Sequence, residues 1–186
     1  MSLFLAQYDK TIADLKAAVR EIEDFPRKGI FTQDVMQLFS GPGLFRPMIL
    51  ELASLVRPLN ADIVAGVYSR GWMLGAPLAH ELEKPFLPIP KSLQASPSAL
   101  REKYVYEYSK DELALEPGVI APGQRVLIVD DQMATGGTMQ AAINLIERQG
   151  GVVVGCAFIL VQTRYDGPGR LSEYPMYALF EKNAQE

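Results

Sequence analysis

The sequence predicts an α/β protein built on a doubly wound, mostly parallel sheet. Short apolar segments typical of buried strands recur at residues 63–67, 86–89, 125–129 and 152–161. Helical patterns of about 10 to 15 residues separate several of them, and this alternation is typical of parallel βαβ units with helices on both faces. A length of 186 residues fits a single domain of this class.

The N-terminal segment favours an amphipathic helix over residues 5–22, which should end before the loop residues 24–30. The apolar positions that predict it are Leu5, Ile12, Leu15, Val19 and Ile22. A second helix is expected from Pro47 to about Val56, because proline is tolerated in a first helical turn. A turn at residues 60–62 should then lead into the strand at 63–67.

The remaining elements follow in the same way. Ser69-Arg70-Gly71 follows the first predicted strand and precedes a helical pattern that reaches about Glu83. The clearest helix, residues 138–149, follows the clearest strand, residues 125–129. Before that strand, residues 104–108 and 112–115 flank Ser109-Lys110-Asp111 and predict a protruding hairpin. The Ser-, Ala- and Pro-rich stretch 90–103 is too long for a simple connection, which is typical of lids and binding loops.

Composition argues against several classes of protein. The net charge is −4, and no dense run of Lys and Arg compensates for it, so nucleic-acid binding is not expected. Cys156, the one cysteine, lies in an apolar run and should be a buried thiol. A single histidine, His80, argues against His-rich metal sites and His-based triads. No signal-like segment or bilayer-length apolar stretch is evident, so a cytosolic protein without membrane association is expected.

The most informative segment is residues 130–138, Asp-Asp-Gln-Met-Ala-Thr-Gly-Gly-Thr, between the clearest strand and the clearest helix. Ligands of open parallel sheets bind at the carboxyl ends of strands, and small residues at a helix N-terminus favour phosphate. The sequence has neither a Walker A motif nor a dinucleotide fingerprint. Asp130 and Asp131 would repel a phosphate that they touched, so we expect them to face a ribose diol, a divalent cation or a developing carbocation. An ordinary strand–helix turn capped by Thr138 and a phosphoacceptor cluster also fit the acidic pair taken alone.

The whole segment, with the strand before it, resembles the signature of the type I phosphoribosyltransferases, which bind 5-phosphoribosyl 1-pyrophosphate. Three further strings resemble motifs of the adenine phosphoribosyltransferases, in family order: residues 24–30 (Asp-Phe-Pro-Arg-Lys-Gly-Ile), Ser69-Arg70-Gly71 before Trp72, and Glu107-Tyr108-Ser109-Lys110. The matches cover most of the chain from about residue 12 to 160. The resemblance implies a type I phosphoribosyltransferase fold over residues 1–186 as one domain, with an N-terminal helix and base-binding hood at 1–40 and a flexible lid and hairpin at 90–115.

The resemblance also implies a reaction, namely Mg²⁺-dependent transfer of the 5-phosphoribosyl group to a purine base, with adenine favoured, giving AMP and pyrophosphate in purine salvage. Asp130 and Asp131 would hold the ribose hydroxyls, and Mg²⁺ would be held mainly through pyrophosphate, ribose hydroxyls and water. The resemblance further implies that the 5′-phosphate is bound by Ala134, Thr135, Gly136, Gly137 and Thr138, and that the pyrophosphate is bound by Ser69, Arg70, Lys91 and Tyr108. Glu107 would assist protonation at the base, and Phe31 and Gln33 would contact the base. The substrates are small molecules, and a homodimer is expected.

Two positions and one stretch depart from the adenine pattern. Gln33 stands where the family has a base-contacting arginine, Ser109 replaces a glycine, and the 90–103 stretch lacks the basic character of the family loop. These differences leave a 6-oxopurine or a modified base open as the acceptor. The same fold also serves as a non-catalytic, donor-binding regulator, although the added DNA-binding domain or basic face usual in such proteins is not evident in the sequence.

Overall fold

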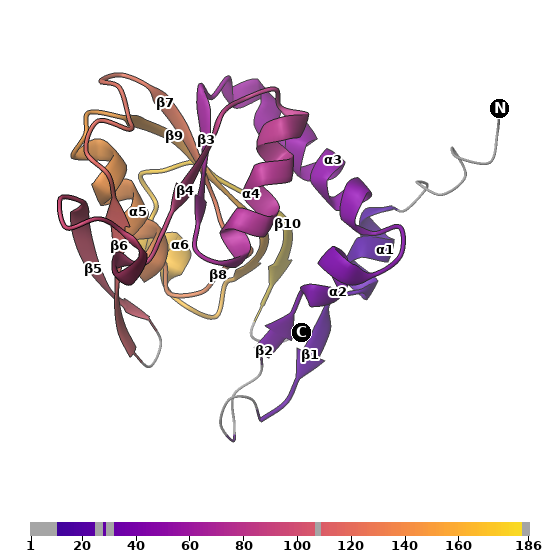
Figure 1. The fold of residues 1–186 in the computed structure, drawn as a ribbon. Helices are drawn as coiled ribbons and strands as arrows, with labels where there is room; N and C mark the ends of the chain where they lie inside the picture. The colour runs from indigo at the N-terminus through magenta and orange to yellow at the C-terminus, as the bar shows by residue number, and fades with distance from the viewer. Residues whose placement is uncertain (1–10, 25–27, 29–31, 107–108, 184–186) are drawn as a thin grey trace. The chain divides into compact units, whose positions relative to one another are not determined.

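A computed structural model describes residues 11–24, 28, 32–106 and 109–183 (Figure 1). By its contacts the chain forms two compact units, residues 1–51 and residues 52–186. No helix within the described ranges has both the length and the apolar character needed to cross a membrane.

The first unit combines short helices with a small antiparallel ribbon. α1 (Ile12–Ala17) begins at a capping box, in which Thr11 and Asp14 satisfy each other's backbone N–H groups. β1 (Arg20–Ile22) pairs with β2 (Thr32–Asp34), and α2 (Met36–Ser40) follows. α3 (Phe45–Val56) begins two residues before the predicted start and continues into the second unit.

The predicted helix over residues 5–22 is wrong at its C-terminal end. α1 stops at Ala17, and residues 20–22 form strand β1 instead. The cause is cross-strand pairing, since Arg20 forms an ion pair with Asp34 and Glu21 accepts a hydrogen bond from Gln33 directly opposite. Helical spacing of apolar residues carried no information about these polar partners.

The second unit is built on a parallel sheet with the strand order β10-β9-β7-β3-β4. The four predicted strands are confirmed as β3 (Ile63–Val67), β4 (Phe86–Ile89), β7 (Arg125–Val129) and β9 (Val152–Gln162). Two strands were not predicted, the edge strand β10 (Met176–Lys182), which has only one buried side chain, and the two-residue β8 (Gln132–Met133), which pairs with β9.

Helices cover both faces of this sheet, as predicted (Figure 1). α5 (Gly137–Glu147) packs in the core cluster that contains Ala65 and Ile128 of the strands. Successive strand residues point to opposite faces, and Val64 is buried outside that cluster, as are Leu74 and Leu78 of α4 (Arg70–Glu81). Short helical segments complete the unit: η1 (Arg57–Leu59), η2 (Ser92–Gln94) and α6 (Gly167–Arg170).

A separate hairpin lies along α5. β5 (Leu100–Tyr106) pairs antiparallel with β6 (Ser109–Leu115), which confirms the predicted hairpin, although the predicted turn residues 109–111 belong to strand β6. Glu102 on β5 accepts hydrogen bonds from Asn144 and Arg148, at 2.9 and 3.1 Å. These contacts fix the hairpin beside the helix that begins at the predicted phosphate loop (Figure 1).

Candidate active site

The acidic pair occupies the break between β7 and β8. The carbonyl of Asp131 accepts N–H groups of Ile159 and Leu160 on β9, at 3.0 and 3.1 Å. The backbone N–H of Asp131 in turn donates to Oδ1 of Asp130 at 2.9 Å. Asp131 is 4% exposed and Asp130 is half-buried. The sheet backbone therefore sets the direction of both carboxylates at the carboxyl ends of the strands.

Arg70 reaches this pair from the neighbouring strand end. A cis peptide bond joins Tyr68 to Ser69, which is exposed, and α4 begins at Arg70. A Cβ atom on Gly71 would lie 2.6 Å from the Val129 carbonyl oxygen, so only glycine lets α4 start this close to the end of β7. Nε of Arg70 lies 2.9 Å from Oδ2 of Asp131.

Burial and charge give the acidic pair its electrostatic character. Burial, together with the charge of Asp131, raises the pKa of the Asp130 carboxyl well above its ordinary value. Burial also raises the pKa of Asp131, although the Arg70 guanidinium acts in the opposite direction. Oδ2 of Asp131 has a charge contact with Arg70 but no aligned hydrogen bond among the described atoms. The pair therefore favours a ligand that donates hydrogen bonds or develops positive charge.

Residues 134–138 form a glycine-rich loop that leads into α5. Gly136 is the N-cap of this helix with a φ of 74°, a left-handed conformation that glycine adopts without strain. The first backbone N–H groups of a helix have no partner within the helix, and the helix dipole adds positive potential there. The loop is thus suited to a phosphate group. Thr135 and Thr138 are half-buried beside it.

The segment that begins α6 supports the loop from outside. A Cβ atom on Gly167 would lie 2.1 Å from the carbonyl oxygen of Ala134 and 2.9 Å from the sulfur of Met133. A Cβ atom on Gly136 would lie 3.3 Å from the backbone of Gly167 in turn. The two backbone segments are therefore in direct contact, and the shape of the loop depends on that contact.

Lys91 follows β4 and contacts the hairpin. Its Nζ lies 2.6 Å from Oδ2 of Asp111 on β6 and 5.9 Å from the centre of the Tyr68 ring. Burial would raise the pKa of Asp111, but the hydrogen bond from Lys91, the N–H of Glu112 and the charge of Lys91 together lower it. The carboxylate of Asp111 is therefore ionised beside the ammonium group.

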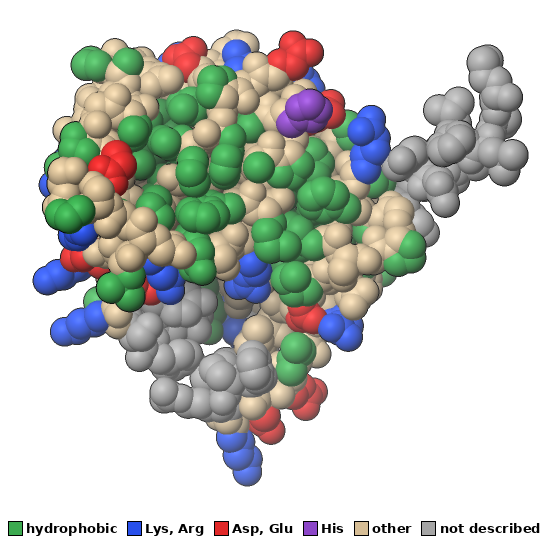
Figure 2. Space-filling model, viewed as in Figure 1, with side chains coloured by type: hydrophobic (Ala, Val, Ile, Leu, Met, Phe, Trp, Pro, Cys, Tyr) green, Lys and Arg blue, Asp and Glu red, His purple; other side chains and the backbone are tan. Residues whose placement is uncertain are grey.

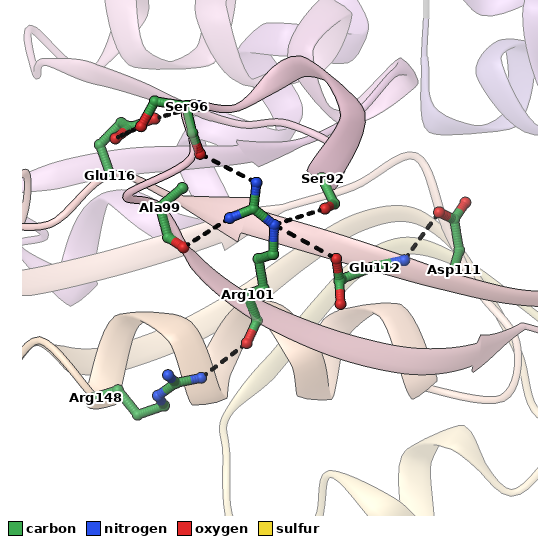
Figure 3. Close-up of polar contacts among 8 residues, drawn as sticks. All are labelled: Ser92, Ser96, Ala99, Arg101, Asp111, Glu112, Glu116 and Arg148. Carbon is green, nitrogen blue, oxygen red and sulfur yellow. Dashed lines mark hydrogen bonds and ion pairs between the residues drawn. The ribbon is translucent and has the colours of Figure 1, made fainter.

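The stretch expected as a long loop folds onto the hairpin. β5 begins at Leu100, so the predicted loop 90–103 is shorter than expected. Figure 3 shows the Arg101 guanidinium donating to the Ser92 hydroxyl and to the carbonyl groups of Ala99 and Ser96, at 3.0, 2.9 and 3.1 Å. Glu116 accepts two further hydrogen bonds from Ser96. These contacts tie residues 92–99 to β5 and to Glu116, the residue that directly follows β6.

The structure places most of the predicted site residues in the second unit. Those that follow β3, β4 and β7 lie at the carboxyl edge of the sheet: Ser69, Arg70, Lys91, Asp130, Asp131, Ala134, Thr135, Gly136, Gly137 and Thr138. Gln33 lies in the first unit, where it is 4% exposed and donates to Glu21. Phe31, Glu107 and Tyr108 lie outside the described residues.

Sequence reasoning missed Asp111, Glu21 and Gly167. The sequence pattern places Asp111 in the hairpin turn and Glu21 in a helix, and it predicts no site contact for either residue. A signal for Gly167 was present, because Gly-Pro-Gly-Arg at 167–170 follows the long strand β9 and therefore lies beyond a strand end at the ligand-binding edge.

Comparisons with known proteins agree with this geometry. The family model described as phosphoribosyl transferase domain matches residues 49–182, more than half of the chain. The adenine phosphoribosyltransferase of Brevibacillus brevis is 42% identical over 168 residues, covering 90% of this chain and 99% of the relative. Adenine phosphoribosyltransferase 4 of Arabidopsis thaliana is 36% identical over 173 residues, covering 93% of this chain and 95% of the relative.

Solved structures lead to the same family. The crystal structure of adenine phosphoribosyltransferase from Thermoanaerobacter pseudethanolicus matches with a TM-score of 0.87 at 35% identity, covering 92% of this chain and all of that one. The Saccharomyces cerevisiae enzyme, in complex with an imino-altritol bisphosphate and adenine, matches with a TM-score of 0.83 at 30% identity, covering 94% and 99%. The chain therefore belongs to the type I phosphoribosyltransferase family, and within it to the adenine phosphoribosyltransferases.

Proposed function

We propose that this protein transfers the 5-phosphoribosyl group of 5-phosphoribosyl 1-pyrophosphate to adenine, forming AMP and releasing pyrophosphate. The contact between Arg70 and Asp131 carries the proposal, because it joins an arginine suited to pyrophosphate to a carboxylate suited to ribose within 2.9 Å. The relatives named adenine phosphoribosyltransferase support adenine as the base.

The donor is anchored at its 5′-phosphate. Backbone N–H groups of residues 134–138 at the start of α5 bind the phosphate oxygens, and the hydroxyls of Thr135 and Thr138 donate from the same loop. Because the phosphate carries no change during the reaction, this interaction contributes to binding and orientation of the donor.

The reaction takes place at the anomeric carbon of the ribose. Its bond to the pyrophosphate oxygen breaks, a bond to a nitrogen of the base forms as that nitrogen gives up its proton, and positive charge develops on the sugar between these events. Asp130 and Asp131 accept the ribose hydroxyls and stabilise that charge. The pKa values of both carboxyls are raised because burial makes their ionised forms unfavourable before positive charge develops on the sugar.

Arg70, Lys91 and Ser69 bind the pyrophosphate as it leaves. Among the described residues, no group of three or more His, Cys, Asp or Glu side chains forms a metal cage. Mg²⁺ in proteins usually keeps several waters and binds substrate phosphates, so an ion that arrives with the donor would be held mainly through pyrophosphate, ribose hydroxyls and water. Such an ion supplies charge neutralisation on the leaving group.

The hood and hairpin residues keep, in this proposal, the roles that the family resemblance implies for them. Phe31 and Gln33 contact the base, Glu107 assists protonation at the base, and Tyr108 contacts the pyrophosphate. Residues 91–99, which precede β5, cover the donor together with the hairpin and exclude water, which would otherwise hydrolyse it.

Assembly and location complete the proposal. We infer a homodimer, because the second unit exposes Leu55, Met73 and Leu93, which are 43%, 44% and 100% accessible. Figure 2 shows hydrophobic side chains gathered over α4 on the face in view. Sedimentation equilibrium on the whole chain tests the dimer.

The one cysteine, Cys156, is buried and free, as suits the cytosol.

A base panel tests the reaction itself. Protein, Mg²⁺ and donor are incubated with adenine, hypoxanthine, guanine or a modified adenine, and pyrophosphate release is measured. Adenine should give the highest kcat/KM, and Asp131→Asn should serve as the matched inactive control. Turnover of hypoxanthine or guanine with adenine inert would reassign the base, whereas donor binding without any turnover would favour a regulator.

A further inference from the structure

We propose that Asp111 is a positioning residue that presents Lys91 to the pyrophosphate, so that strand β6 of the hairpin contributes to leaving-group binding. This inference rests on the proposed function, in which Lys91 binds pyrophosphate. It concerns a residue on the hairpin strand that touches no reacting atom.

Two sets of contacts tie Lys91 to β6. The backbone of Lys91 bridges antiparallel to Leu113, and the N–H of Ala114 donates to the Pro90 carbonyl at 3.0 Å. The side chain is held separately, because Nζ lies 2.6 Å from the Asp111 carboxylate. Strand β6 therefore holds both the backbone and the ammonium group of Lys91 in place.

The Lys91 ammonium group also lies near the residues that directly precede the arginine of the site. Nζ lies 5.9 Å from the centre of the Tyr68 ring, and Tyr68 directly precedes Ser69 and Arg70. The Tyr68 ring is held edge-on to Trp72 at 5.1 Å between centroids. The Lys91 ammonium group is thus in contact with Asp111 of the hairpin and near the ring of Tyr68, which begins the segment that carries Arg70.

The carboxylate keeps the lysine ordered without using up its donors. An ammonium group has three N–H donors, so one contact to Asp111 leaves donors for pyrophosphate oxygens. The Lys91 side chain is 41% exposed, and a long side chain at such a surface would otherwise lose rotamer freedom only when the ligand binds. Ordering it beforehand lowers that cost of binding.

The role of Asp111 predicts a specific pattern of defects. Asp111→Asn removes the charge at nearly constant shape, and should weaken pyrophosphate binding by about threefold to tenfold, as loss of a partly exposed charge contact does. Binding of ribose 5-phosphate should stay unchanged, since that ligand lacks the leaving group. KM for the donor should rise more than kcat falls, because pyrophosphate is held in both ground and transition states.

The experiment measures pyrophosphate and ribose 5-phosphate binding by calorimetry, together with KM and kcat, for the full-length protein. Glu112→Gln is the matched control, because it removes the same charge from the next residue of β6, whose carboxylate faces Arg101. The double variant Asp111→Asn with Lys91→Ala should be no weaker than Lys91→Ala alone, and Asp111→Glu should restore part of the affinity.

The two possible failures are distinguishable. If wild-type protein binds pyrophosphate and turns over the donor, but Asp111→Asn matches wild type or binds pyrophosphate more tightly, the positioning role of Asp111 is overturned. Equal losses of affinity for pyrophosphate and ribose 5-phosphate in Asp111→Asn would show that Asp111 has a general structural role, and would also overturn its positioning role. If wild type neither binds the donor nor releases pyrophosphate, the proposed function fails, and the role of Asp111 fails with it.

Discussion

Nε of Arg70 lies 2.9 Å from Oδ2 of Asp131, so the start of α4 and the end of β7 share a charge contact before substrate binds. The Asp131 side chain is 5% exposed and that of Arg70 is 41% exposed. The carboxylate therefore depends on the guanidinium for compensation, whereas Arg70 can also reach a ligand.

This contact predicts two similar losses of turnover. Arg70→Ala and Asp131→Asn should each lower kcat by roughly 10² to 10³, because each removes a preorganised partner of charge that develops in the transition state. Arg70→Lys, which keeps the charge but loses the guanidinium fork, should retain more activity. Steady-state kinetics with adenine measures all three. Unchanged kcat in both Arg70→Ala and Asp131→Asn would refute the role of the pair.

Asp130 should show a conflict between stability and activity. Because burial and Asp131 raise its pKa, the folded state favours the protonated carboxyl. The stability that it contributes is present below the unfolded pKa of about 3.9 and is lost as the pH rises through the raised folded pKa. Asp130→Asn should therefore raise Tm of the ligand-free protein at pH 7, while kcat falls by about 10².

Melting curves from pH 5 to 8 test this sign. The gain in Tm of Asp130→Asn over wild type should shrink as the pH falls, because the wild-type carboxyl then becomes neutral too. For a chain of this size, a gain of 1 kcal/mol corresponds to about 2–4 °C. A lower Tm for Asp130→Asn at pH 7 would contradict the prediction.

Two glycines of α6 offer a matched steric test of the phosphate loop. Gly167→Ala would place a methyl group 2.1 Å from the Ala134 carbonyl oxygen, so backbone must move. We expect a loss of about 1–3 kcal/mol in stability, with weaker binding of ribose 5-phosphate. Gly169→Ala meets only Oδ1 of Asp166, at 2.4 Å, and that side chain can rotate. Equal Tm and equal affinity in the two variants would show that the contact with Ala134 does not shape the loop.

Gln33 offers a test of base selectivity. Its amide donates to Glu21 on the opposite strand, so an arginine at this position would find a carboxylate partner already in place. Gln33→Arg restores the residue that the family pattern has there, and should raise kcat/KM for adenine by about fivefold, the effect of roughly 1 kcal/mol. Gln33→Met, similar in size but without hydrogen bonds, should lower it. The kcat/KM ratio of adenine to hypoxanthine measures selectivity, and a fall in that ratio for Gln33→Arg would contradict the prediction.

The sequence by itself determined the fold class and the position of the main ligand-binding edge. The buried strand segments Ile63–Val67 and Val126–Val129 are continuous apolar runs, because a parallel sheet covered on both faces needs apolar side chains on both sides of each strand. The glycines and aspartates of residues 130–138 follow one such strand directly. Local pattern was sufficient there, since each of these features depends on neighbours in the chain.

Tertiary structure alone decided how the site is assembled. Residues 20–22 became a strand because Gln33 and Asp34 lie opposite them. Asp131 lies beside Arg70 because β9 holds the break after Val129: the Ala157 carbonyl accepts the N–H of Asp130, and two N–H groups of β9 donate to the Asp131 carbonyl. The carboxylate of Asp111 reaches Lys91 only because β6 runs antiparallel to the end of β4. Each of these contacts joins residues distant in sequence, and periodicity along one segment carries no information about a partner supplied by another.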